Sequence, residues 1–148
     1  MPEDNFSQLR MAHPAPQRDR VGPGALWFGI AAAPFAWTVQ QIFSSTLAGY
    51  ACYPHADPRI SPVWNGLSPV LFTVSAAAFA IALSGGAVAW NAWRQTRSER
   101  LGSAHHLMET GDGRTRFMAM CGMLTSTVFV IALAFGTTAL YVVPLCGR

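Results

Sequence analysis

The sequence of 148 residues contains no lysine, and only 11% of its residues are charged, whereas 51% are hydrophobic. A soluble domain of this size usually carries about a quarter charged residues. The seven acids and ten arginines all lie outside three long runs: residues 25–50, 67–93 and 117–143. Each run exceeds the roughly 20 apolar residues with which a helix crosses a bilayer. The lack of charge therefore argues against a soluble domain and predicts an all-α integral membrane protein with three transmembrane helices.

Ionisable residues are missing from the three runs, which argues against several functions. All four histidines lie outside them: His13, His55, His105 and His106. Haem held inside a membrane usually needs a histidine on a spanning helix, and ion transport typically uses an intramembrane ionisable residue. The sequence also lacks a phosphate loop, a nucleotide fingerprint and a nucleophile–base pair. We therefore expect a protein that is not an enzyme acting alone and that has no catalytic, cofactor-binding or metal-binding residue.

The first 24 residues are polar and contain four prolines. Such a segment buries too little apolar surface to fold alone. We predict that residues 1–24 form a flexible cytoplasmic segment and that residues 25–148 form one three-helix transmembrane bundle. Because a long polar stretch precedes the first run, that run is expected to be a retained signal anchor and not a cleaved signal peptide.

The arginines predict how the chain lies in the membrane. Three arginines precede the first run and five lie between the second and third runs. The connection between the first and second runs contains a single arginine, Arg59. The positive-inside rule then places the N-terminus in the cytoplasm and the C-terminus in the periplasm. The arginine- and alanine-rich composition suggests a bacterium, so we expect a multi-pass inner-membrane protein. Membrane orientation also explains the net charge of +3, and no nucleic-acid partner is predicted.

Two cysteines follow helix ends that this orientation places on the periplasmic side. Cys52 follows the first run and Cys146 follows the third, so both lie in an oxidising compartment. A bridge between them would clamp two helix ends and contribute roughly 4–5 kcal/mol in the chain-entropy model. We favour this disulfide. The alternative is a pair of free thiols that bind copper with His55, since such ligands suit a soft metal.

The second half of the first run carries a polar face. Four residues share it at the spacing i, i+3, i+4 and i+7: Trp37, Gln40, Gln41 and Ser44. Polar residues of this kind either form hydrogen bonds between helices of one bundle or contact a larger partner, a quinone head group or a lipid. We predict a partner or lipid interface at these four residues. Arg114 and Arg116 are expected at the inner interface, near anionic head groups.

The second run is rich in small residues at a spacing of four. One series is Ala78, Ala82 and Gly86, and another is Ala76, Ala80 and Ser84. Small residues let helix backbones approach closely in a membrane. We therefore expect this helix to be clasped on both sides.

Two groups of residues form a more distinctive pattern. The first is Ala33-Pro34-Phe35-Ala36-Trp37, followed by Gln40, Tyr50, Cys52 and Pro54. The second is Gly113-Arg114-Thr115-Arg116-Phe117, with Pro144 and Cys146 after the third run. Together they resemble small uncharacterised bacterial inner-membrane proteins of three helices, associated with gene clusters of haem–copper cytochrome oxidases. The resemblance covers residues 26–146. It implies membership of a respiratory complex, or service to one, and carries over no catalytic residue.

These observations predict an accessory, non-catalytic subunit of a bacterial respiratory membrane complex. The resemblance points to a haem–copper cytochrome oxidase, which the subunit would stabilise through helix packing and lipid contact. Two alternatives remain open. One is an oxidase assembly factor that handles copper or haem through Cys52, Cys146 and His55. The other is a small homo-oligomeric transporter. The expected partners are therefore oxidase subunits and the lipid bilayer.

Overall fold

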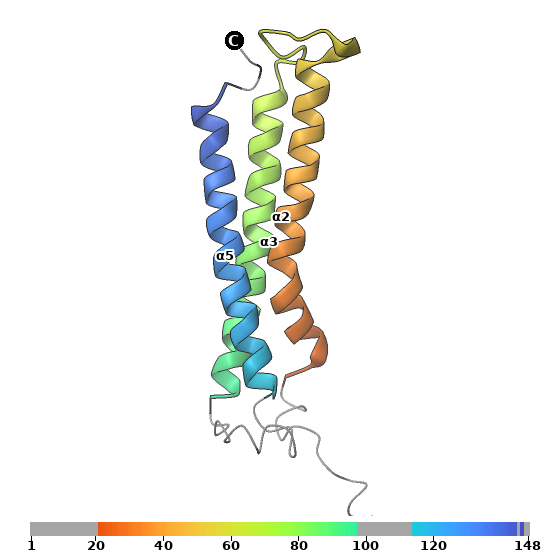
Figure 1. The fold of residues 1–148 in the computed structure, drawn as a ribbon. Helices are drawn as coiled ribbons and strands as arrows, with labels where there is room; N and C mark the ends of the chain where they lie inside the picture. The colour runs from red at the N-terminus through yellow and green to blue at the C-terminus, as the bar shows by residue number, and fades with distance from the viewer. Residues whose placement is uncertain (1–20, 98–113, 145, 147–148) are drawn as a thin grey trace, which may run out of the picture.

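The computed structural model describes residues 21–97, 114–144 and 146. Three long helices make up most of this part: α2 (Pro23–Cys52), α3 (Leu67–Gln95) and α5 (Arg114–Val142). They lie side by side along their lengths, and each helix contacts both others (Figure 1). A short 3₁₀ turn, η1 (Pro54–Ala56), lies in the connection between α2 and α3. The described chain is therefore an all-helical bundle of three helices.

The helices extend slightly beyond the charge-free runs. Helix α2 already includes Pro23 and Gly24, which the sequence assigned to the N-terminal segment, because proline is well suited to the first helical turn. Helix α3 continues through Arg94, and α5 begins at Arg114. Val21, which was also assigned to that segment, is buried against the bundle. Residues 1–20 of the predicted flexible segment lie outside the described residues. Charge thus marks the end of each apolar run but not the end of the helix.

Two of the helices are long and apolar enough to cross a membrane. They are α3, over Leu67–Gln95, and α5, over Thr115–Leu140. Only 28% and 22% of their most apolar segments are buried inside the bundle. The core helix of a soluble protein would be mostly buried, so their exposure is unusual for such a helix. Helix α2 has a similar length, but Pro34, Gln40 and Gln41 interrupt its apolar sequence, and it is not one of these two helices.

Glycines on α2 and α5 let the three helices approach one another closely. A methyl group placed on Gly122 of α5 would lie 3.1 Å from the carbonyl oxygen of Gly29 and 3.0 Å from Cβ of Ala89. Near this point the Ser126 hydroxyl donates a hydrogen bond of 3.3 Å to the same carbonyl oxygen of Gly29. Small residues on α5 thus let it pack against the backbone of α2.

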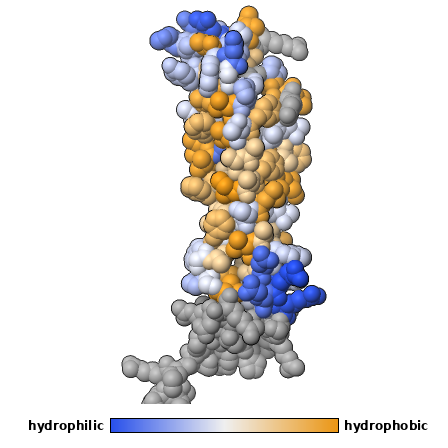
Figure 2. Space-filling model, turned by 180° about the vertical axis from the view of Figure 1, so that it is seen from behind, coloured by the Kyte–Doolittle hydropathy of each residue, from blue (hydrophilic) through white to orange (hydrophobic). Residues whose placement is uncertain are grey.

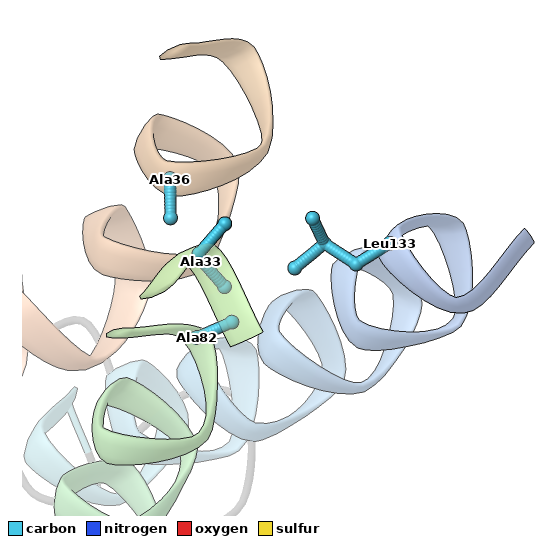
Figure 3. Close-up of a cluster of buried hydrophobic side chains, with 5 residues drawn as sticks. Ala33, Ala36, Ala82 and Leu133 are labelled. Carbon is cyan, nitrogen blue, oxygen red and sulfur yellow. The ribbon is translucent and has the colours of Figure 1, made fainter. Parts of the chain in front are cut away.

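Small side chains also fill the middle of the bundle. Its central cluster contains four alanines and one leucine: Ala33, Ala36, Ala78, Ala82 and Leu133. Figure 3 shows Leu133 reaching from α5 toward the alanines of α2 and α3. Around this cluster the rings of Trp37 and Phe129 pack with their centroids 5.4 Å apart. The core is narrow because it is built largely from alanine, so most larger side chains of the three helices lie on the outside.

Candidate functional site

The outer surface of the bundle is the feature that most needs a functional explanation. Large apolar side chains are exposed on all three helices, for example Phe35 (69%), Leu83 (58%) and Phe135 (75%). Figure 2 shows a mainly apolar band along the length of the bundle, with hydrophilic residues gathered toward its two ends. Soluble monomers rarely expose apolar surface on this scale. The chain therefore carries a broad surface that is suited to a lipid or protein environment.

One end of the bundle, here termed the disulfide end, is tied by a covalent bridge. Cys52 and Cys146 form a disulfide, and their Cα atoms are 5.4 Å apart. Both cysteines are buried, at 3% and 5% exposure. The bridge joins the end of α2 to the chain that follows α5 (Figure 1). The disulfide favoured from the sequence is thus present. The alternative copper site needs two free thiols, and these sulfurs are bonded to each other.

The connection between α2 and α3 folds back over the disulfide end. The backbone N–H of Arg59 donates to the carbonyl of Cys52 (2.9 Å), and that of Val63 donates to the carbonyl of Ala51 (3.1 Å). These bonds satisfy carbonyl groups that the end of a helix leaves without intrahelical donors. His55 is exposed and has a left-handed backbone conformation with φ of 56°. Within the described residues no group of three or more His, Cys, Asp or Glu side chains is arranged to hold a metal ion.

The opposite end, here termed the arginine end, carries positive charge. Arg94 and Arg97 are exposed at the end of α3, and Arg97 lies over the ring of Trp93 at 5.6 Å from its centroid. Arg116 is half-buried in the first turn of α5. Arg114 is the first residue of α5, but its side chain lies outside the described part of the structure. The interface predicted from the sequence includes Arg114 and Arg116 but not Arg94, which lies at the same end of the bundle.

The predicted polar face of α2 is divided between the inside and the outside of the bundle. Gln40 is only 3% exposed, and its Nε2 donates a hydrogen bond of 3.3 Å to Oγ of Ser75 on α3. Trp37 and Ser44 are half-buried. Gln41, in contrast, is exposed. The predicted interface must therefore be redrawn without Gln40, because a side chain that faces α3 does not contact an external partner.

The exposed polar residues of α2 form a different face, here termed the α2 stripe. It consists of Thr38, Gln41 and Ser45, which follow one another at spacings of three and four. The Thr38 hydroxyl donates to the carbonyl of Pro34 (2.8 Å), and the Ser45 hydroxyl donates to the carbonyl of Gln41. The Gln41 amide makes no side-chain hydrogen bond within the described part of the chain. The interface predicted from the sequence includes neither Thr38 nor Ser45, although their spacing from Gln41 indicates that the three share a face.

The small residues of α3 also divide between two surfaces. Ala78 and Ala82 are buried, and Gly86 is half-buried between α3 and α5. The second series is exposed: Ala76, Ala80 and Ser84. Helix α3 does contact both other helices, but only the first series takes part in that packing. The second series faces outward.

No protein-family model, curated protein or solved structure matches this chain. Its function is therefore argued from the surfaces of the described residues.

Proposed function

We propose that the chain is a multi-pass protein of the bacterial inner membrane in which all three helices span the bilayer. The exposed apolar band on α2, α3 and α5 supports this placement, because lipid is the surrounding in which such side chains are stable. The three helices are also nearly equal in length, with 30, 29 and 29 residues. A helix of 29 residues is about 43 Å long, which matches a bilayer with its interfacial regions.

The exposed aromatic residues support a spanning role for α2 as well, despite its lower hydropathy. Trp27 (64% exposed) lies near one end of α2 and Tyr50 (80% exposed) near the other. They are separated by about 35 Å along the helix. Tryptophan and tyrosine favour the two membrane interfaces.

The orientation follows from the two ends of the bundle. The arginine end would face the cytoplasm, where basic residues are enriched, and the disulfide end would face the periplasm. The Cys52–Cys146 bridge supports this choice independently, since disulfides persist in oxidising compartments. Residues 1–24 would then begin in the cytoplasm, and the C-terminus would lie in the periplasm.

Gln41 is the observation that carries the proposed function of the chain within the membrane. It lies about 4 Å along the helix from the midpoint between Trp27 and Tyr50, which is the middle of the proposed span. An amide left without hydrogen bonds in hydrocarbon is strongly unfavourable, at roughly 2–7 kcal/mol. A neighbouring helix that presents both a donor and an acceptor would remove this cost. We therefore infer that the α2 stripe docks against a helix of a partner protein.

The chain would then act as an accessory, non-catalytic subunit of a larger membrane complex. Its apolar surface and its α2 stripe suit helix packing and lipid contact. The resemblance of its residues 26–146 to proteins from oxidase gene clusters makes subunits of a haem–copper cytochrome oxidase the proposed partner. An assembly factor that binds copper through Cys52 and Cys146 is less well supported, because it needs the two thiols free.

Purification of the complex tests this proposal. The chain would be tagged at its N-terminus, extracted from its own membrane in a mild detergent, and examined by mass spectrometry and by the haem spectrum of the eluate. We expect stoichiometric recovery of haem-bearing oxidase subunits. The Gln41→Leu variant should lose them, whereas the matched Gln40→Leu variant should retain them because Gln40 faces α3.

Three results would contradict the proposal. Recovery of the wild-type chain alone would argue against a stable subunit. Recovery as a homo-oligomer that Gln41→Leu dissolves would assign the α2 stripe to contact between copies of this chain, as the transporter alternative expects. Retention of the partner by the Gln41→Leu variant would show that docking uses another surface.

A further inference from the structure

A groove of about 540 Å³ lies on the outer surface between α3 and α5. Its α3 wall includes Ala82, Gly86 and Trp90, and its α5 wall includes Met123 and Ile131. Two of the α3 residues that line it, Ala82 and Gly86, have little or no side chain. Along α3 it extends over about 12 Å, from Ala82 to Trp90. Its walls are mainly apolar, and its length follows the helix axes.

The groove becomes polar and then basic toward the arginine end. Trp90 and Asn91, which line that end of the groove, are both exposed. Arg94 follows Trp90 by four residues and Asn91 by three, so it lies on the same face of α3, one turn further on. Its side chain is exposed. The apolar groove is therefore followed, one turn further along α3, by the exposed and positively charged Arg94.

Helix α5 supplies a second arginine at the same level. Ala92 and Ala119 share one core cluster, and this antiparallel register places Arg94 of α3 level with Arg116 of α5, to within one residue. Arg116 precedes the groove residue Met123 by seven residues, or two helical turns, and so lies on the same side of α5. The two helices that form the groove thus each carry an arginine beyond its end: Arg94 lies one turn past Trp90, and Arg116 lies two turns past Met123.

We propose that the groove binds one acyl chain of an anionic phospholipid, with the phosphate held between Arg94 and Arg116. The apolar walls suit a hydrocarbon chain, and the paired guanidinium groups suit a phosphate, which arginine binds through parallel hydrogen bonds. The amide of Asn91 lies between these two regions and offers a further donor to the head group. A neutral head group or an apolar helix would make no use of two arginines at this point.

The inference rests on the proposed membrane placement but not on the proposed partner complex. In that placement the arginine end faces the cytoplasm, so the lipid would belong to the inner leaflet. Anionic lipid attracts basic residues near the surface with about a fivefold gain in affinity for each arginine. Losing either arginine should therefore weaken binding by a measurable factor without emptying the groove of neutral lipid.

Native mass spectrometry of the full chain tests the site. The protein would be extracted in a mild detergent and titrated with phosphatidylglycerol or with phosphatidylcholine that has the same acyl chains. We expect one phosphatidylglycerol to be retained at concentrations where phosphatidylcholine is not. Arg94→Gln and Arg116→Gln should each lower phosphatidylglycerol affinity about fivefold. Arg59→Gln, which removes the same charge at the disulfide end, should leave the affinity unchanged.

A second pair of variants tests the groove itself. Ala87→Phe places a ring on an exposed groove residue, whereas Ala76→Phe places the same ring on an exposed part of α3 outside the groove. Ala87→Phe should abolish retention of phosphatidylglycerol, and Ala76→Phe should not. Helical content measured by circular dichroism would show whether each variant is folded.

The possible results separate the two proposals. Equal retention of both lipids, or full retention by Ala87→Phe, would overturn the lipid site while leaving the subunit proposal intact. Recovery of the chain without detergent in the soluble fraction would overturn the membrane placement and the lipid site together. Loss of the partner complex with lipid binding preserved would affect the subunit proposal alone.

Discussion

At the scale of single residues, two neighbouring glutamines have opposite surroundings. Gln40 is buried and donates a hydrogen bond to Ser75, whereas Gln41 is exposed and makes no side-chain hydrogen bond in the described structure. Consecutive helical residues point about 100° apart, so a bundle can enclose one and expose the other. The sequence placed both on one face because they follow Trp37 by three and four residues, a spacing that one helix face accommodates. Only the position of α3 shows which glutamine faces inward.

The two glutamines should therefore affect different properties when replaced. Gln40→Leu removes a hydrogen bond between helices and should lower the free energy of unfolding by about 0.6 kcal/mol, and by at most about 1.7 kcal/mol. Gln41→Leu should leave this free energy unchanged or raise it slightly. Denaturation of the purified chain in detergent micelles measures both. Equal destabilisation by the two variants would contradict the assignment of Gln40 to the inside and Gln41 to the outside.

Gly122 provides a second test at the residue scale, because its Cα–H faces the backbone of α2. In Gly122→Ala the new methyl group would lie 3.1 Å from the Gly29 carbonyl oxygen, so the helices must separate. We expect a loss of about 1–3 kcal/mol of stability, as for other overpacked sites. Gly136→Ala on the same helix is the matched control, since nothing lies within 4 Å of its new methyl group. Similar unfolding curves for the two variants would contradict the close helix crossing.

At the scale of elements, the disulfide links the end of α2 to the chain beyond α5. The bridge closes a loop with a sequence separation of 94 residues, and both of its cysteines are buried. A buried bridge of this kind is inaccessible to thiols in solution, which suits a structural clamp better than a redox switch. It also fixes α5 at the disulfide end, where the described chain has little other structure beyond Val142.

Removing the clamp should weaken the bundle from that end. Cys52→Ser combined with Cys146→Ser should lower stability by up to about 4–5 kcal/mol in the chain-entropy model. The same loss should follow when wild-type protein is unfolded in the presence of a reductant. Cys121→Ser is the matched control, because Cys121 is a free cysteine on α5. Thiol counting under non-reducing conditions should find one reactive cysteine per unfolded chain; three would show that the bridge does not form.

The extents of the helices could be predicted from the sequence better than their packing. The ends of the charge-free runs at 67–93 and 117–143 differ from the ends of α3 and α5 by at most three residues. The groove between these helices could not be predicted, because it depends on their antiparallel register. Arg94 and Arg116 are 22 residues apart in sequence, and only the packing of Ala92 on Ala119 places them at one level.

Helix α2 shows a further limit of hydropathy alone. Its polar and small residues lower its mean hydropathy, so only α3 and α5 meet the criterion for membrane-spanning helices. Yet several polar groups on α2 have partners within the bundle or on their own helix, as Gln40 and Thr38 do. A hydropathy sum counts these groups as if they met lipid. Because these groups already have hydrogen-bond partners, they weigh less against the proposal that α2 spans the membrane.

At the scale of the whole molecule, the bundle has an apolar belt between two polar ends. The belt gives the proposed membrane placement, and the difference between the arginine end and the disulfide end gives the proposed orientation. In the proposed placement, Gln41 lies near the middle of the bilayer and the α3–α5 groove lies toward its inner leaflet. The functions proposed for both depend on this placement. The proposed placement therefore requires that α2 crosses the membrane together with α3 and α5.

The sides of the membrane on which the two chain ends lie test this claim most directly. If three helices cross, the ends lie on opposite sides; if only α3 and α5 cross, the ends lie on the same side. Green fluorescent protein and alkaline phosphatase would each be fused in turn to the N-terminus and to the C-terminus. When proteins are exported by the general secretory route, green fluorescent protein is fluorescent only in the cytoplasm. Alkaline phosphatase is active only in the periplasm.

If all three helices span the membrane, we expect fluorescence from the N-terminal fusion and phosphatase activity from the C-terminal fusion. Fluorescence from both ends, or phosphatase activity at both, would contradict this placement, because the chain would then cross the membrane an even number of times and α2 would not be a span.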